Sequence, residues 1–345
     1  ELDSYSVNFR LSEFKIDTVS YYNKEYFDFP IPGKLEHRAE RIISGPKANY
    51  PRFVSFLMDY VIDDISHNVD YSGGISMLGA KVVGFGSLFR KASLRFLRRD
   101  TLVIVARSEA FHFSPEILSG MNTEISLYIN VDSIYHPSTG MDYYIDENRI
   151  SFYRSGNFQS EAPYLNSYHK VEMNFEQLSW NLDDDLILFK MKEGAATGLA
   201  NFQSDNLFDE RAYYRIQGID EENILITLRR YSEKVFDITF RSDDFARYSR
   251  IRYNQLQQIL IRLAVQGFIN YDLDRELITL RQKLYDWIYA SVNSIDYDVI
   301  DLHSETLSPY ENASLDLTNN DLHINGLKAI RLSNAQAVYI FPENQ

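Results

Sequence analysis

The first two-thirds of the chain alternate apolar and polar residues, which is the pattern of strands buried on one face. The alternation is clear in Ala92–Phe96, Glu124–Ile129 and Val171–Phe175. Polar breaks such as Arg98-Arg99-Asp100 and Leu182–Asp185 have the composition of turns. The pattern therefore predicts a strand-rich region over residues 1–218.

Four segments share one order: three or four alternating apolar positions, a polar break and a second strand. They are residues 6–20, 124–135, 170–182 and 313–324. Such a degenerate repeat of paired strands is typical of a β-roll or β-solenoid, in which each unit buries its apolar face against the next. Because the spacing is irregular, a set of antiparallel sandwiches is the alternative.

Residues 219–293 have helical periodicity instead. Leu256, Ile259, Leu260, Leu263 and Ala264 form a stripe at three-and-four spacing, and Gly267 ends it. We expect helices at 220–231, 242–248, 253–266 and 282–293, a strand at 236–240 and a hairpin at 268–280.

The order helix, strand, helix, helix, hairpin is that of a winged helix. Residues 294–345 return to the alternation of strands. The expected fold class is mainly β with an α+β insertion: a β-roll or β-solenoid-like region at 1–218, a winged-helix-like module at 219–293 and resumed strand repeats at 294–345.

The amino-acid composition favours some classes of structure and function and opposes others. The 25 Tyr and 22 Phe among 345 residues favour strands. The net charge of -14 opposes non-specific binding to nucleic acid and to anionic membranes. The absence of Cys excludes disulfides, thiolate metal sites and Cys nucleophiles, and it fits an oxidising compartment.

A winged helix most often binds DNA through its recognition helix, here residues 253–266. Residues 241–283 hold eight basic and five acidic residues, so the local charge permits DNA binding. However, Asp272 and Asp274 make the predicted wing tip acidic, and a protein contact is favoured over nucleic acid. The candidate interaction surface consists of Arg250, Arg252, Gln255, Gln258 and Arg262.

Other candidate chemistries lack the required pattern. The seven His are scattered, and the acidic groups around His67 and at Asp183–Asp185 match no Ca²⁺ loop, so solvated turns are favoured there. The glycine-rich segment 73–79 lacks the Lys-Ser/Thr of a phosphate-binding loop and is typical of a tight corner in β-structure. We expect no catalytic, cofactor-binding or metal residues, no cofactor and no enzyme activity.

Several phrases resemble a family of large, uncharacterised cell-envelope proteins of Bacteroidetes-type bacteria. They are "ARSEAFHFSPE" (106–116), "DSIYHPSTGMDYYIDENRISFYRS" (132–155), "DYDVIDLHS" (296–304) and "LSNAQAVYIFPEN" (332–344). The resemblance implies a periplasmic or exported location and no established activity. Because the chain begins at Glu1 without Met and ends directly after a predicted strand, we expect an internal fragment whose signal sequence lies outside it. No apolar run is long enough for a transmembrane segment.

The expected function is a non-enzymatic structural or protein-interaction scaffold of the cell envelope, with the winged helix as a protein contact or rigid spacer. A DNA-binding regulator is one alternative, and it predicts a basic surface around Arg250, Arg252 and Arg262. A binder of a lipid or glycan within the β-roll is another, and it predicts an open apolar groove.

Overall fold

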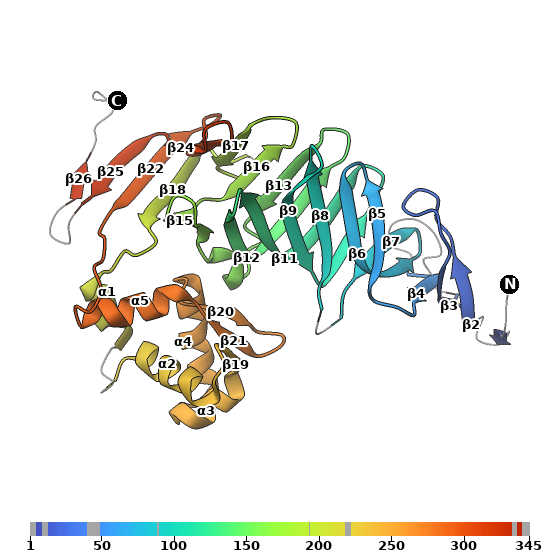
Figure 1. Ribbon diagram of the computed structural model, residues 1–345. Coiled ribbons are helices and arrows are strands. Elements are labelled where there is room, and N and C mark those ends of the chain that lie inside the picture. The colour runs from blue at the N-terminus through green and yellow to red at the C-terminus, as the bar shows by residue number, and fades with distance from the viewer. Residues whose placement is uncertain are drawn as a thin grey trace. The chain divides into compact units, whose positions relative to one another are not determined.

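The computed structural model (Figure 1) describes residues 5–8, 13–39, 49–87, 90–192, 194–217, 222–332 and 337–339. In these residues the chain forms 26 strands and five α-helices. The expected coarse fold class, mainly β with a helical insertion, is confirmed. Both chain ends, on which the expectation of a fragment rested, and most of the phrase at 332–344 lie outside the described residues.

The chain forms two compact units. The first consists of Glu1–Tyr128, Ser138–Phe152 and Ser179–Asp185, and the second of Ile129–Pro137, Tyr153–Leu178 and Leu186–Gln345. The helical insertion belongs to the second unit together with β-strands.

The first unit is built of antiparallel strands. Those from its N-terminal part are β1 (Tyr5–Asn8), β2 (Glu13–Tyr21), β3 (Ile31–Arg38), β4 (Arg52–Ser55), β5 (Tyr60–Ser66), β6 (Val69–Leu78), β7 (Lys81–Phe85), β8 (Ala92–Arg98), β9 (Thr101–Ser108), β10 (Ala110–Phe113) and β11 (Ile117–Ile129). Strands β12 (Asp132–Tyr144), β13 (Arg149–Tyr153) and β16 (Gln177–Asn181) each have residues in both units.

Strand β6 changes its pairing partners halfway along its length. Its first half pairs with β5 and β8, and its second half pairs with β4 and β7. Gly73 and Gly74 lie where the pairing changes, and a Cβ at Gly73 would lie 2.2 Å from the Tyr71 hydroxyl. A side chain at Gly73 would clash with the buried Tyr71, so glycine is required where β6 changes partners.

The second unit has its own antiparallel pairings. Strands β12, β14 (Tyr164–Asn166), β15 (Val171–Asn174), β18 (Thr197–Ser204), β22 (Asp301–Leu307), β25 (Leu327–Arg331) and β26 (Ala337–Tyr339) pair in that order. Strands β17 (Leu186–Lys190), β23 (Ala313–Asp316) and β24 (Asp321–Ile324) also pair in that order.

The helical insertion, here called the helical module, covers residues 210–291 (Figure 1). Its elements are α1 (Glu210–Gln217), α2 (Ile224–Val235), β19 (Thr239–Arg241), α3 (Ser242–Ser249), α4 (Tyr253–Val265), β20 (Ile269–Asp272), β21 (Leu277–Leu280) and α5 (Gln282–Ser291). Leu256, Leu260, Leu263 and Ala264 of the predicted stripe are buried in its core, whereas Ile259 is half-buried.

Three local predictions differ from the structure. Helix α1 lies in the stretch expected to be strands. Its sequence is polar and did not indicate that the helix packs against α5. The Asp209 carboxylate caps the helix by accepting a hydrogen bond from the Ala212 N–H. Helix α2 begins at Ile224, after an Asn223 cap, and residues 218–221 lie outside the described residues. The strand expected at 236–240 begins only at Thr239, since Phe236 takes a left-handed conformation and ends α2.

Polar contacts join the helical module to strands and loops of the second unit. Lys283 of α5 pairs with Glu172 of β15, and the Trp287 indole N–H donates to the Leu207 carbonyl at 2.7 Å. The side-chain amides of Gln159 and Asn270 donate to the Tyr271 carbonyl and to the Tyr135 hydroxyl. Among the described helices, none is long and apolar enough to cross a lipid bilayer.

Candidate functional site

The turn between α3 and α4 holds an arginine in a demanding backbone conformation. Arg250 follows α3 with φ 59° and ψ 19°, in the left-handed region where glycine is favoured. Its side chain is exposed. An exposed arginine at such a position gives its segment no packing in return for the backbone strain, which motivates a functional hypothesis for its side chain.

The polar face of α4 is exposed along its length. Arg252, Gln255, Gln258 and Arg262 are all exposed, and their spacing of three, three and four residues places them on one side of the helix. The structure thus brings the five predicted surface residues together on α4 and the turn before it. We call this set, with Arg250, the α4 face.

The arginines of the α4 face have no acidic partner in the described residues, whereas their neighbours do. Arg247 forms ion pairs with Asp243 and Asp244, and Arg241 pairs with Asp243 and Glu276. The hydrogen bond from Arg241 lowers the pKa of the Asp243 carboxyl. Three guanidinium groups, those of Arg250, Arg252 and Arg262, are therefore available to an external acidic group.

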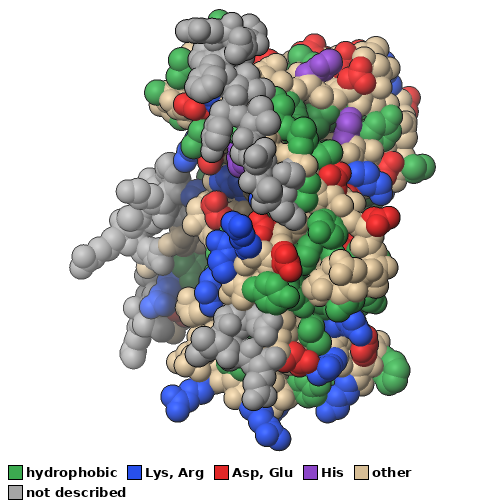
Figure 2. Space-filling view, turned by 90° about the vertical axis from the view of Figure 1, so that its left-hand side faces the viewer, with side chains coloured by type: hydrophobic (Ala, Val, Ile, Leu, Met, Phe, Trp, Pro, Cys, Tyr) green, Lys and Arg blue, Asp and Glu red, His purple; other side chains and the backbone are tan. Residues whose placement is uncertain are grey.

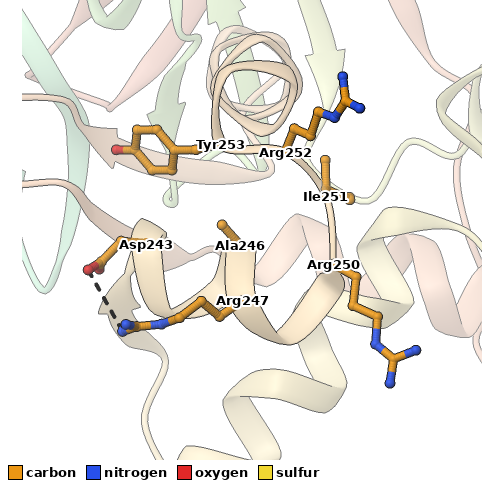
Figure 3. A pocket seen from close by; sticks show the side chains of 7 residues that line it. All are labelled: Asp243, Ala246, Arg247, Arg250, Ile251, Arg252 and Tyr253. Atoms are coloured by element: carbon orange, nitrogen blue, oxygen red, sulfur yellow. Dashed lines mark ion pairs between the residues drawn. The ribbon is translucent and has the colours of Figure 1, made fainter.

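A hollow of about 450 Å³ lies beside the turn and is lined by Asp243, Ala246, Arg247, Arg250, Ile251, Arg252 and Tyr253. Figure 3 shows the side chains of Arg250 and Arg252 pointing away from the Asp243–Arg247 ion pair. The unpaired guanidinium groups of Arg250 and Arg252 therefore point away from this pair. The remaining lining includes Ala246, Tyr253 and the Asp243–Arg247 ion pair, whose charges offset each other. The arrangement suits a contact with a surface better than enclosure of a small ion.

An exposed aromatic side chain was missed by the sequence analysis. Phe236, which ends α2 with φ 56°, is 95% exposed, and Val235 and Ile238 beside it are 39% and 54% exposed. The sequence predicted that Phe236 begins a strand at 236–240. A signal was available in the length of the α2 periodicity, which continues to Val235.

The β20–β21 hairpin follows α4, and it makes hydrogen bonds to other segments of its unit. Asn270 and Tyr271 of β20 take part in the contacts with Tyr135 and Gln159 described above. At the tip, Asp274 is exposed, and Asp272 accepts a hydrogen bond from the Arg275 N–H. The hairpin therefore presents an acidic tip.

The acidic groups singled out in the sequence make turn and cross-strand contacts. Asp64 accepts a hydrogen bond from the Asn68 N–H, and Asp70 accepts one from the Asp64 N–H. Asp183 accepts from Asn148, and Asp185 pairs with Arg98. In the part of the chain that the structure describes, no three His, Asp or Glu side chains are grouped to hold a metal ion.

Comparison of the chain with models of protein families, with curated proteins and with solved structures finds no match.

Proposed function

We propose that this chain is a non-enzymatic structural and protein-interaction scaffold, in which the helical module presents the α4 face to a partner protein. We further propose that the β-strands form a β-roll-like support and that α2 to β21 form a winged helix. The order helix, strand, helix, helix, hairpin supports the winged helix, and pairing of β19 with β21 supplies its small sheet.

The observation that carries the proposal is the engagement of the hairpin. A DNA-reading winged helix uses both its recognition helix and its wing, and a wing near phosphates favours basic side chains. Here β20 is hydrogen-bonded to Gln159 and Tyr135, and the tip carries Asp272 and Asp274. The docked hairpin fixes the helical module to the β-strands of its unit and leaves the α4 face exposed.

The composition of the exposed surface supports a protein partner. Interfaces between proteins are enriched in aromatic residues and arginine, and such residues dominate their binding energy. The helical module exposes Phe236 almost completely, together with the unpaired Arg250, Arg252 and Arg262. A partner with an acidic surface and an apolar pocket would match both features.

The cell envelope is the proposed location, either periplasmic or exported. The resemblance of four phrases to envelope proteins and the absence of Cys support it. Fractionation of cells that make the protein, with protease treatment of intact cells, tests this location; recovery only with the cytosolic fraction would contradict it.

A DNA-binding regulator is the second candidate, favoured by the three unpaired arginines. The face shown in Figure 2 carries Lys and Arg side chains as well as Asp and Glu side chains. If all three arginines met phosphates, the logarithm of affinity would fall with the logarithm of salt with a slope of roughly -3. Fluorescence anisotropy with a labelled duplex from low to physiological salt measures this slope; binding lost in the Arg250→Gln, Arg252→Gln, Arg262→Gln variant would favour the regulator.

A further inference from the structure

A second hollow, of about 130 Å³, lies within the second unit between the start of α5 and strands β14 and β15. Its walls carry Arg281 and Lys283 from the α5 side, Glu172 from β15, and Asp205 and Asp286. This hollow is more enclosed than the one at the α3–α4 turn, which is largely open surface.

Arg281 is a buried cation without a direct counter-ion. The residue is 8% exposed, no ion pair of the described residues includes its guanidinium, and Nη1 has no hydrogen-bond partner. Burial lowers the pKa of Arg281. Since an unpaired buried charge is strongly disfavoured in a folded protein, an anion at this position would satisfy the guanidinium.

The Glu172 carboxylate in the lining of the hollow is already engaged. Glu172 Oε2 accepts hydrogen bonds from Lys283 Nζ at 2.5 Å and from Gln203 Nε2 at 2.6 Å. The negative charge of Glu172 favours the protonated form of Arg281 from a distance. The Glu172 carboxylate offsets the charge of Lys283 by direct contact. The charge of Arg281 therefore needs an anion bound in the hollow.

The start of α5 adds to the attraction for an anion. Arg281 is the residue before the first turn, and its side chain makes no capping hydrogen bond to that turn. The Leu284 N–H donates to the Arg281 carbonyl, and the ten-residue helix places the positive end of its dipole at the hollow, which Gln282 and Lys283 of its first turn line. A carboxylate placed there would contact both the helix and Arg281.

The same hollow has acidic groups that a simple anion would not need. Asp205 and Asp286 line it, and the Asp286 carboxylate accepts a hydrogen bond from Gln282 at 2.9 Å. Burial raises the pKa of Asp205, Lys170 opposes this shift, and Glu172 and Asp286 add to it. A positive group near Asp205 and Asp286 would relieve this repulsion.

We propose that this hollow binds a small zwitterion of the α-amino acid class, with its carboxylate at Arg281 and the start of α5 and its ammonium group at Asp205 and Asp286. The size fits, because an engineered cavity of about 150 Å³ holds one benzene molecule of six heavy atoms, as many as alanine has. Leu165 and Val171 supply apolar lining for a short side chain.

Isothermal titration of the full chain with L-alanine and glycine tests the proposal, with acetate and ethylamine as single-charge comparators. Saturable binding of an amino acid at least tenfold tighter than either comparator is expected. Equal binding of acetate and L-alanine would overturn the zwitterion assignment, and no binding of any amino acid would overturn the site.

Variants locate the binding. Arg281→Gln is expected to abolish it, whereas Asp205→Asn and Asp286→Asn should weaken L-alanine at least tenfold without weakening acetate. Arg262→Gln, on the α4 face, is the matched control and should bind as the parent chain does. If Arg281→Gln fails to fold, the two Asn variants decide: unchanged L-alanine binding in both would contradict the proposal. Failure here leaves the proposed role of the α4 face untouched, because no residue is shared.

Discussion

Lys283 Nζ lies 2.5 Å from Glu172 Oε2, and the two side chains are 9% and 2% exposed. The residues are 111 positions apart, on α5 and on β15. Lys283 Nζ also lies 5.4 Å from the centre of the Phe268 ring and 5.9 Å from that of Trp287. A buried, hydrogen-bonded ion pair thus ties the helical module to the strands of its own unit.

Lys283→Ala should destabilise the second unit by about 3–5 kcal/mol, because it leaves the buried Glu172 carboxylate without its ion-pair partner and with only the hydrogen bond from Gln203. Urea unfolding followed by tryptophan fluorescence measures the loss, since Trp287 lies beside Lys283. Glu233→Gln is the matched control: it removes the exposed pair with Arg229, which contributes only about 0.3–0.5 kcal/mol. Equal effects of the two changes would contradict the buried role of Lys283.

Leu260→Asp should unfold the helical module, because Leu260 is fully buried on the inner face of α4 and an unpaired carboxylate there has no compensation. Circular dichroism should show loss of helix signal. Gln258→Asp, two residues earlier on the exposed face, should keep the fold within about 0.5 kcal/mol. A folded Leu260→Asp chain of unchanged stability would refute the placement of α4.

Arg250→Gly should stabilise the turn between α3 and α4 by up to about 1 kcal/mol, since glycine adopts its left-handed conformation without a Cβ penalty. The same change removes one of the three unpaired guanidinium groups of the α4 face. The midpoint temperature of thermal unfolding should therefore rise, while the affinity for the partner protein falls. A variant that is destabilised would show that the Arg250 side chain contributes to the fold.

Asp209 gives a pH dependence of known sign. Burial raises its pKa, but hydrogen bonds from the Ala212 N–H and from Arg331 outweigh burial and leave the pKa below its ordinary value of 3.8. A depressed pKa in the folded state contributes stability above pH 3.8, and this contribution is lost as pH falls through the folded pKa. Asp209→Asn, which retains a capping side chain, should therefore be less stable than the parent at pH 7.

The difference between the parent chain and Asp209→Asn should shrink when unfolding is repeated at pH 3. Arg331 contacts both Asp209 and Asp301 at 3.2 Å, so its charge has a remaining partner in the variant. A stability difference that stays constant between pH 7 and pH 3 would show that Asp209 acts only as a cap.

The periodicity of apolar residues predicted the features that depend on neighbouring residues in the sequence. Helix α4 lies within one residue of its expected range because its apolar stripe packs into one core. Gln255, Gln258 and Arg262 followed as the other side of the same helix, and Arg250 and Arg252 as the turn before it. Gly73 lies close to Tyr71, as glycine in a strand run indicates.

Contacts between distant segments were beyond such reasoning. The alternation in Val171–Phe175 placed Glu172 on a polar face, yet Glu172 is 1% exposed. Its partner Lys283 comes from an insertion whose position on the strands no local pattern encodes. Arg281 was counted only in the local charge of residues 241–283, and no local pattern indicated that packing buries it. The second hollow was therefore missed.

Site-specific photo-crosslinking tests the central claim, that the α4 face contacts a protein. A crosslinking amino acid at Gln258, exposed on α4, is irradiated in cells that make the protein, with Glu233 on exposed α2 surface as the control position. The account predicts a discrete, nuclease-resistant protein adduct from Gln258, absent from Glu233 and lost with Arg252→Glu and Arg262→Glu. A nuclease-sensitive adduct, or no adduct from Gln258, would contradict it.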